Sequence, residues 1–263
     1  MINTLFELAK MQLKQYQIYK SNFILFTLNR IVEAAIYIFV WLAIYNQTGS
    51  AEGYTLNEII VYYLLVVSLV PVSTWGLNED IAYSIRNGRI NKELLNPITY
   101  FMYYFGVTMG EKIFAILVGA ASFVICCIIW QATVTTTLLN FVMFLILILL
   151  GTLLTFYIQM IVGTAGFYTD SIWGMTILKK SIISIFSGTI APLTLFPHWF
   201  QSIANILPFR ELIYTPINIF LGQVSFVEMI CSVCKLVIWI IILSIISKVF
   251  FNHAIKKIRI NGG

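Results

Sequence analysis

The stretch LLNFVMFLILILLGTLLTFYIQMIVGTAG, residues 138–166, contains no charged side chain along its whole length. A helix needs about 20 mostly apolar residues to cross the hydrocarbon core of a bilayer. This stretch is therefore predicted to be a transmembrane helix. Comparable apolar runs lie near residues 23–45, 58–76, 104–130, 175–191 and 226–249. Together the runs predict an all-α, polytopic membrane protein with six transmembrane helices.

Composition supports a membrane protein. The 263 residues are 60% hydrophobic and only 10% charged, and the mean hydropathy is +0.90. A soluble domain carries roughly a quarter of its residues charged. The first twenty residues lack the short apolar core of a signal peptide, so the first span is expected to remain as an anchor.

The basic residues gather on alternate connections between the predicted spans. They are Lys10, Lys14 and Lys20 before the first span; Arg86, Arg89 and Lys92 after the second; Lys179 and Lys180 near the start of the fifth; and Lys248, Lys256, Lys257 and Arg259 at the end. The other connections hold one basic residue, Arg210. The positive-inside rule predicts a multi-pass protein of the cell membrane with both termini in the cytoplasm. This placement explains the net charge of +5 without a nucleic-acid partner.

Residues 1–22 are predicted to form an amphipathic helix on the membrane surface, preceding a six-helix domain over residues 23–263. Leu5, Leu8, Ala9, Leu13 and Tyr16 share one side of a helical wheel, and Glu7, Lys10 and Lys14 share the other. Such a helix is typical of membrane interfaces. A solvated lead-in is the alternative.

Two connections have a character of their own. Residues 78–100, NEDIAYSIRNGRINKELLNPITY, are polar, with a turn signal at Asn87-Gly88, and predict one or two small helices below the membrane. Residues 191–225 are apolar and aromatic but interrupted by prolines. Because polar backbone cannot face lipid unsatisfied, we expect this 191–225 segment to form an outer re-entrant helical hairpin packed against protein. The candidate gate residues are Pro192, Pro197, Trp199, Pro208, Phe209 and Pro216.

Catalytic and metal-binding motifs are lacking in the sequence. There is no GxxxxGK[ST] loop for nucleotide phosphates, and the only histidines, His198 and His253, fall in different loops. The cysteines Cys126, Cys127, Cys231 and Cys234 lie in apolar runs, where a thiol usually packs. The chain is therefore predicted to be neither an enzyme nor a metal-binding protein.

Charged residues within the spans are candidates for function. Glu33 is the main acidic candidate, and Arg30, three residues earlier, is placed to neutralise it or to share a role in coupling or substrate contact. Lys235, seven residues after Glu228 in the sixth span, is expected to snorkel, find a partner or contact an anionic substrate.

Small polar residues mark a candidate translocation path. They are Tyr62, Ser68, Ser73 and Thr74 in the second span and Ser181, Ser184 and Ser187 in the fifth. Such a stripe either lines a path or allows close helix packing, and the two roles are compatible.

Two stretches resemble a known family. IRNGRINKELLNPITY, residues 85–100, has a Gly followed by Leu-Leu-x-Pro, and SGTIAPLTLFPHWFQSIANILPFRELIYTPINIFLG, residues 187–222, carries the ordered prolines and aromatics. Both are similar to the type-2 permeases of ATP-binding-cassette (ABC) exporters, and the resemblance covers nearly the whole chain.

The resemblance implies a cytoplasmic coupling helix within about residues 79–99 that docks on a separate ATPase, with Arg86 to Leu95 at its centre. The implied contact residues are Arg86, Asn87, Gly88, Arg89, Ile90, Lys92, Glu93 and Leu94. A solvated loop is the alternative. The cofactors ATP and Mg would sit on the ABC ATPase, and the other partners would be membrane lipid and a second permease, identical or related.

The expected function is the membrane-spanning subunit of an ATP-driven exporter of an amphipathic, drug-like, lipid-linked or peptide substrate. Two rivals are an ATPase-independent secondary transporter or channel and a membrane sensor or immunity scaffold that transports nothing.

Overall fold

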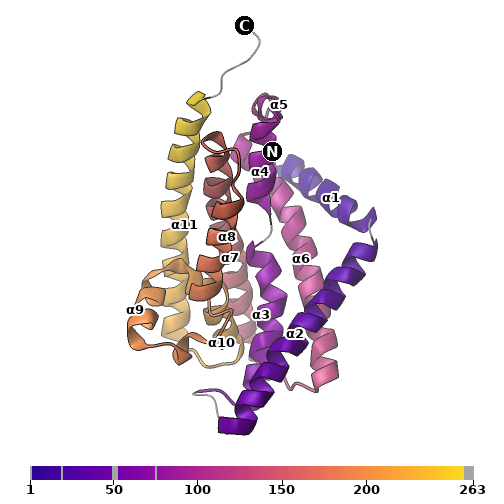
Figure 1. The fold of residues 1–263 in the computed structure, drawn as a ribbon, viewed down its shortest axis with the longest axis vertical. Coiled ribbons are helices and arrows are strands. Elements are labelled where there is room, and N and C mark those ends of the chain that lie inside the picture. The colour runs from indigo at the N-terminus through magenta and orange to yellow at the C-terminus, as the bar shows by residue number, and fades with distance from the viewer. Residues whose placement is uncertain (1, 19, 49–52, 75, 258–263) are drawn as a thin grey trace.

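In the computed structural model the described residues are 2–18, 20–48, 53–74 and 76–257, and every regular element among them is a helix (Figure 1). The expected all-α fold is thus confirmed. The α-helices are α1 (Ile2–Ile18), α2 (Lys20–Thr48), α3 (Leu56–Thr74), α4 (Leu77–Arg86), α5 (Ile90–Leu94), α6 (Tyr100–Trp130), α7 (Leu138–Thr164), α8 (Trp173–Phe186), α9 (His198–Ile206), α10 (Tyr214–Phe220) and α11 (Phe226–Ala254). The short 3-10 helices are η1 (Ala165–Phe167), η2 (Leu193–Leu195), η3 (Pro208–Leu212) and η4 (Ile255–Lys257).

The long helices run between two ends of the molecule. α1, α5 and the C-terminal end of α11 lie at one end, which we call the basic end, and α9 and α10 lie towards the other (Figure 1). The predicted alternation of basic and non-basic connections therefore agrees with the arrangement of the helices. Which end faces the cytoplasm stays a prediction.

Four of the described helices are long and apolar enough to cross a membrane. They are α2 over Phe23–Gln47, α6, α7 together with η1, and α11. α3 contributes a shorter apolar stretch, Leu56–Val70, and α8 has only 14 residues. That α3 and α8 also cross, giving six spans, stays a prediction.

α3 is the central helix of the fold. Its residues 61–69 are all buried, and it packs against α2, α6, α7 and α10. A helix that is apolar all round is expected to be enclosed by other helices. Gly119 of α6 permits the close approach, because a Cβ at this position would lie 2.6 Å from the Ser68 carbonyl oxygen.

The N-terminal segment forms a helix, α1, over Ile2–Ile18, and its place on the membrane surface stays a prediction. Its buried Ala9 faces α6, whereas Glu7, Lys10 and Lys14 are exposed. The close contact between α1 and α6 depends on Gly110 of α6, where a Cβ would come within 2.6 Å of the Ala9 carbonyl oxygen. The side chains of Tyr16 and Lys20 lie outside the described residues, as does Arg259.

The fifth predicted span is too long. The sequence indicated a helix over residues 175–191, but α8 ends at Phe186 because Gly188 adopts a φ of 82°, which stops an α-helix. The Gly188 carbonyl then accepts a hydrogen bond of 2.7 Å from the hydroxyl of Tyr62 on α3. The chain is thereby turned towards the 191–225 segment.

The 191–225 segment forms short helices packed on protein. α10 is buried along its whole length against α3 and α7, and the Tyr54 hydroxyl donates to the Asn218 side chain at 2.7 Å. Pro197 and Pro208 occupy the starts of α9 and η3, where a missing N–H costs nothing. How deeply the segment enters the bilayer stays a prediction.

Candidate functional site

The polar segment over residues 78–100 forms two short helices, in agreement with the expected one or two. Arg86 is the last residue of α4, and α5 covers only Ile90–Leu94. Between them lies a turn in which Gly88 has a φ of 68°, a left-handed conformation that glycine adopts without strain. The coupling helix that the resemblance implied over Arg86 to Leu95 is therefore shorter than expected, because residues 87–89 form a turn before α5. The Asn87-Gly88 turn signal already indicated this break.

The exposed surface around the turn from α4 to α5 is basic and carries two large apolar side chains, whereas the exposed acidic residues Glu79 and Asp80 lie at the start of α4. Leu95 is 85% exposed and Tyr83 is 53% exposed, and the guanidinium of Arg89 lies 5.8 Å from the centre of the Tyr83 ring. The expected contact residues that are exposed are Arg86, Asn87, Gly88, Arg89 and Lys92. We call Tyr83, these five residues and Leu95 the foot. Tyr83 and Leu95 were not among the expected contacts, although both are large apolar residues within the polar segment 78–100.

The remaining expected contacts are turned inward. Ile90 is buried in an apolar cluster with Leu77 and Ile81. Glu93 is 5% exposed, and its carboxylate accepts hydrogen bonds from Arg89 Nε at 3.0 Å and from the Tyr104 hydroxyl at 2.7 Å. These groups fix α5 against α6.

Glu93 also affects the charge of the foot. Partial burial lowers the pKa of Arg89, but the hydrogen bond and the negative charge of Glu93 outweigh this, so the pKa is raised. Arg89 therefore carries a permanent positive charge, held in place by a buried carboxylate.

The root of α4 is hydrogen-bonded to α8. Asn78 is fully buried; its amide donates to the Thr176 hydroxyl at 2.7 Å and its carbonyl oxygen accepts from Lys179 Nζ. At the other end of α4, Arg86 Nη1 donates to the Asp170 carbonyl at 2.9 Å, in the connection that leads to α8. α4 is thus tied to α8 and to the chain that precedes it.

Polar side chains also form hydrogen bonds with backbone groups on both sides of the break between α3 and α4. Lys112 of α6 donates to the Val72 carbonyl, and the Leu77 N–H donates to Gln159 Oε1 of α7 at 3.0 Å. Broken helices in membranes need such partners for the freed backbone groups. The sequence reasoning missed Lys112 and its neighbour Glu111, which is buried near Gln12 of α1. Glu33 is therefore joined by a second acidic residue within a span.

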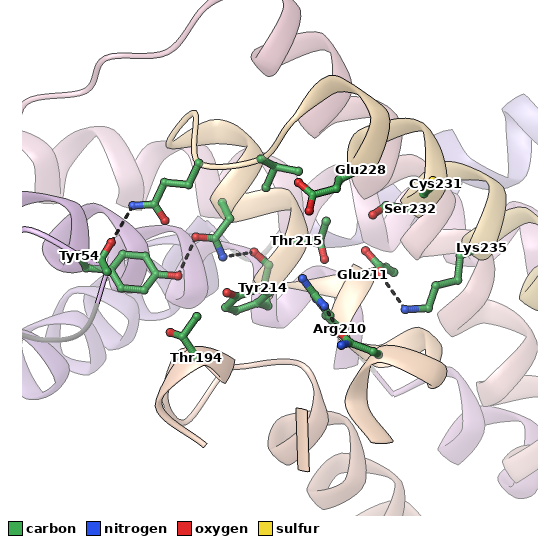
Figure 2. Close-up of a pocket in the computed structure, with 15 residues that line it drawn as sticks. Tyr54, Thr194, Arg210, Glu211, Tyr214, Thr215, Glu228, Cys231, Ser232 and Lys235 are labelled. Atoms are coloured by element: carbon green, nitrogen blue, oxygen red, sulfur yellow. Dashed lines mark hydrogen bonds and ion pairs between the residues drawn. The ribbon is translucent and has the colours of Figure 1, made fainter. Parts of the chain in front are cut away.

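A cavity of about 570 Å³ lies near the opposite end, between the 191–225 segment and α11 (Figure 2). Lys235 Nζ forms an ion pair with Glu211 Oε1 at 2.8 Å across this cavity. The sequence suggested Glu228 as the nearest acidic neighbour of Lys235. Glu228 instead caps its own helix with Ser225.

The comparison with known families supports the resemblance seen in the sequence. The family described as ABC-2 family transporter protein matches residues 31–262, nearly the whole chain. The chain belongs to the ABC-2 transporter family. Membership implies a transport permease role beside an ABC ATPase, and permeases of this family are generally not catalytic themselves. No curated protein matches the chain.

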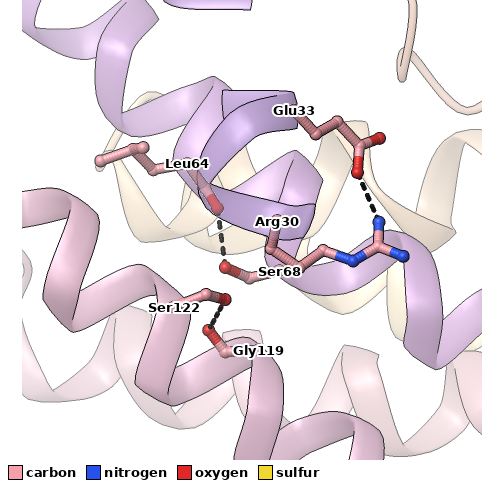
Figure 3. Close-up of polar contacts among 6 residues, drawn as sticks. All are labelled: Arg30, Glu33, Leu64, Ser68, Gly119 and Ser122. Carbon is pink, nitrogen blue, oxygen red and sulfur yellow. Dashed lines mark hydrogen bonds and ion pairs between the residues drawn. The ribbon is translucent and has the colours of Figure 1, made fainter. Parts of the chain in front are cut away.

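Within this ABC-2 permease the predicted pair of Arg30 and Glu33 is confirmed. The two side chains form an ion pair along α2 (Figure 3). A pair of this kind compensates two charges that the bilayer would otherwise disfavour. A further role in coupling or substrate contact stays a prediction.

The candidate path residues of the permease do not share one surface. Tyr62, Ser68 and Ser187 are buried, and the Ser68 hydroxyl donates to the Leu64 carbonyl within its own helix (Figure 3). Ser181 is exposed and Ser184 half-buried on α8. The side chains of Ser73 and Thr74 lie outside the described residues. A path lined by these residues therefore stays a prediction. On α8 the exposed face is the one that carries Ser181.

The candidate gate residues of the permease separate into two groups. Pro192, Pro208 and Pro216 are buried, and Phe209 is half-buried beside α8. Pro197 and Trp199 are exposed at the start of α9. The buried group fixes the segment to the core, and the exposed group is available to lipid or a partner.

Proposed function

We propose that this ABC-2 permease is the membrane-spanning subunit of an exporter that a separate ABC ATPase drives, with the foot as the ATPase contact. The observation that carries the proposal is the construction of α4. Its exposed end bears basic and apolar side chains, and its buried root is hydrogen-bonded to α8 through Asn78. One short helix thus joins the surface of the basic end to α8.

In this proposal α4 transmits the movement of the ATPase subunits to α8. Closure of two ATPase subunits displaces the foot, and α4 carries α8 with it because Thr176, Lys179 and the Asp170 carbonyl are bonded to α4. α8 is short, and one of its faces is exposed. A movement of α8 therefore changes the surface that is available to a second permease. Two permeases, identical or related, enclose the path, and the 191–225 segments close it on the outside.

The proposed orientation places the basic end, and so both termini, in the cytoplasm. The distribution of Lys and Arg supports it. A thiol reagent that cannot cross membranes tests it on Leu95→Cys and on Thr135→Cys, in the connection between α6 and α7, in an otherwise cysteine-free chain. Leu95→Cys should react only in inside-out vesicles and Thr135→Cys only in right-side-out vesicles. The opposite pattern overturns the orientation.

The cargo class we propose is an amphipathic, drug-like, lipid-linked or peptide molecule moved outward, and the aromatic content of 15% supports it. The test is substrate-stimulated ATP hydrolysis by the permease and its ATPase in proteoliposomes. Transport by the purified chain without ATPase would favour a secondary transporter or channel. ATPase binding without stimulation by any substrate would favour a sensor or immunity scaffold.

A further inference from the structure

The cavity beside the 191–225 segment has a position that suits a lipid headgroup. Its α11 wall runs from Glu228 to Lys235, which are two and nine residues after the start of the helix at Phe226. At 1.5 Å per residue, the wall lies between about 3 and 14 Å along the axis of a membrane-crossing helix. With α11 spanning the bilayer and its headgroups from end to end, this range includes the boundary between headgroups and acyl chains.

Three buried polar atoms of the cavity residues have no hydrogen-bond partner among the described residues. They are Glu211 Oε2, Arg210 Nε and Thr215 Oγ1. Glu211 and Thr215 are each only 3% exposed, and Lys235 binds just one oxygen of the Glu211 carboxylate. Figure 2 shows these side chains gathered in the same part of the cavity. Because buried polar atoms are nearly always paired, this group of atoms points to a ligand.

The free groups define the chemistry of that ligand. Glu211 Oε2 accepts a hydrogen bond and carries negative charge, whereas Arg210 Nε donates and carries positive charge. The charged side chains of the cavity wall are Arg210, Lys235, Glu211 and Glu228, so two positive charges balance two negative ones. A neutral site with separated charges favours a zwitterion over an anion or a cation.

We infer that this cavity binds a zwitterion whose primary ammonium donates to Glu211 and whose phosphate or carboxylate oxygen accepts from Arg210. Phosphatidylethanolamine and free phosphoethanolamine both offer these groups. The surroundings favour the lipid, because Trp199 and Ile206 on α9 and Val227 on α11 are at least 66% exposed and offer an apolar surface for acyl chains. Binding requires no ATPase and is independent of the proposed export function.

Native mass spectrometry of the purified full chain tests this inference, after release from nanodiscs that contain equal parts of phosphatidylethanolamine, phosphatidylcholine and phosphatidylglycerol. We expect phosphatidylethanolamine to be retained over phosphatidylcholine, whose quaternary ammonium cannot donate an N–H. Glu211→Gln and Arg210→Gln should each reduce its retention roughly tenfold, as expected for one hydrogen bond to a charged group. Glu33→Gln is the matched control, a carboxylate that also pairs with a basic residue but is not part of the cavity wall.

The outcomes separate the two sources of the headgroup. Displacement of the lipid by free phosphoethanolamine would show that the headgroup suffices, and retention against it would show that the intact lipid is the ligand; either supports the site. Equal retention of the three lipids, or unchanged retention in Arg210→Gln, would overturn it. If Glu211→Gln fails to fold because Lys235 loses its partner, lipid retention by Arg210→Gln is the deciding measurement. Loss of lipid selectivity with ATPase coupling intact would leave the proposed function standing.

Discussion

Asn78 on α4 donates a hydrogen bond of 2.7 Å to the hydroxyl of Thr176 on α8, although the two residues are 98 positions apart in the sequence. Asn78 also accepts from Lys179, one turn further along α8. Both Asn78 and Thr176 are buried. This contact ties the helix that carries the foot to α8, and most of the predictions below concern the segment that it anchors.

Replacing Asn78 should separate the foot from α8. Asn78→Leu keeps a similar shape but leaves the buried Lys179 and Thr176 without this partner, which costs about 1–3 kcal/mol per lost buried polar contact. We expect ATP hydrolysis to continue while α8 no longer follows it. The measurement is the rate at which Ser181→Cys, exposed on α8, reacts with a thiol reagent with and without ATP.

The control for this experiment is Asn91→Leu, a change of the same kind on the exposed side of α5. It should leave the ATP-dependent change in labelling intact. If Asn78→Leu retains that change as well, the contact with α8 does not carry the motion.

Reversing charge on the foot should weaken its binding to the ATPase. Exposed ion pairs contribute roughly 0.2–1 kcal/mol each, so the double variant Arg86→Glu, Lys92→Glu should bind several-fold to more than tenfold more weakly. The loss should shrink at high salt, because screening reduces both attraction and repulsion. Co-purification of the ATPase at two ionic strengths measures it. Lys248→Glu, an exposed change on α11 outside the foot, should bind normally; equal weakening by both variants would argue against a specific foot.

The hydrogen bond between Tyr104 and Glu93 should stabilise α5. Tyr104→Phe and Glu93→Gln each remove part of a buried charged contact, and a double-mutant cycle should give a coupling of about 1–2 kcal/mol in unfolding free energy.

Replacing Arg89 and Glu93 together with opposite charges would place a buried ammonium beside Tyr104. That variant should enter the membrane but fail to couple hydrolysis to export. Strictly additive single effects, or wild-type export by the reversed pair, would contradict this role for Glu93.

Gly188 should tolerate no side chain. An alanine there would hold a φ of 82° and place its Cβ 2.8 Å from the Tyr62 hydroxyl. The left-handed conformation alone costs about 1–2 kcal/mol. We expect Gly188→Ala to lower the thermal unfolding midpoint, whereas Gly174→Ala, with open space around its Cβ, should not. Equal midpoints for the two variants would show that the turn adapts freely.

The sequence is a good guide to the long helices and a poor one to the contacts between them. Residues 138–166 predict α7 because lipid selects apolar residues over the whole length of a span. The end of α8 was misplaced because Ser187 and Gly188 are small enough to be tolerated within a span. The left-handed φ of Gly188 and its hydrogen bond from the Tyr62 hydroxyl on α3 place the turn there.

The buried polar contacts were beyond prediction for a similar reason. Lys235 pairs with Glu211, 24 residues away, whereas periodicity along one helix could offer only Glu228. Lys112 and its neighbour Glu111 lie in an otherwise apolar run, and the carbonyl partner of Lys112 at Val72 becomes free because α3 ends at Thr74. Such contacts depend on how three or four helices meet, which one sequence does not encode in any local pattern.

Photo-crosslinking from the foot tests the central claim most directly. A photoreactive amino acid replaces Leu95, the most exposed apolar residue of the foot, in the full complex in membranes, and a second variant carries it at Ile206 near the opposite end. We predict a crosslink from position 95 to the ATPase, changed in yield by ATP, and none from position 206. No crosslink from position 95, or equal crosslinks from both positions, would contradict the account.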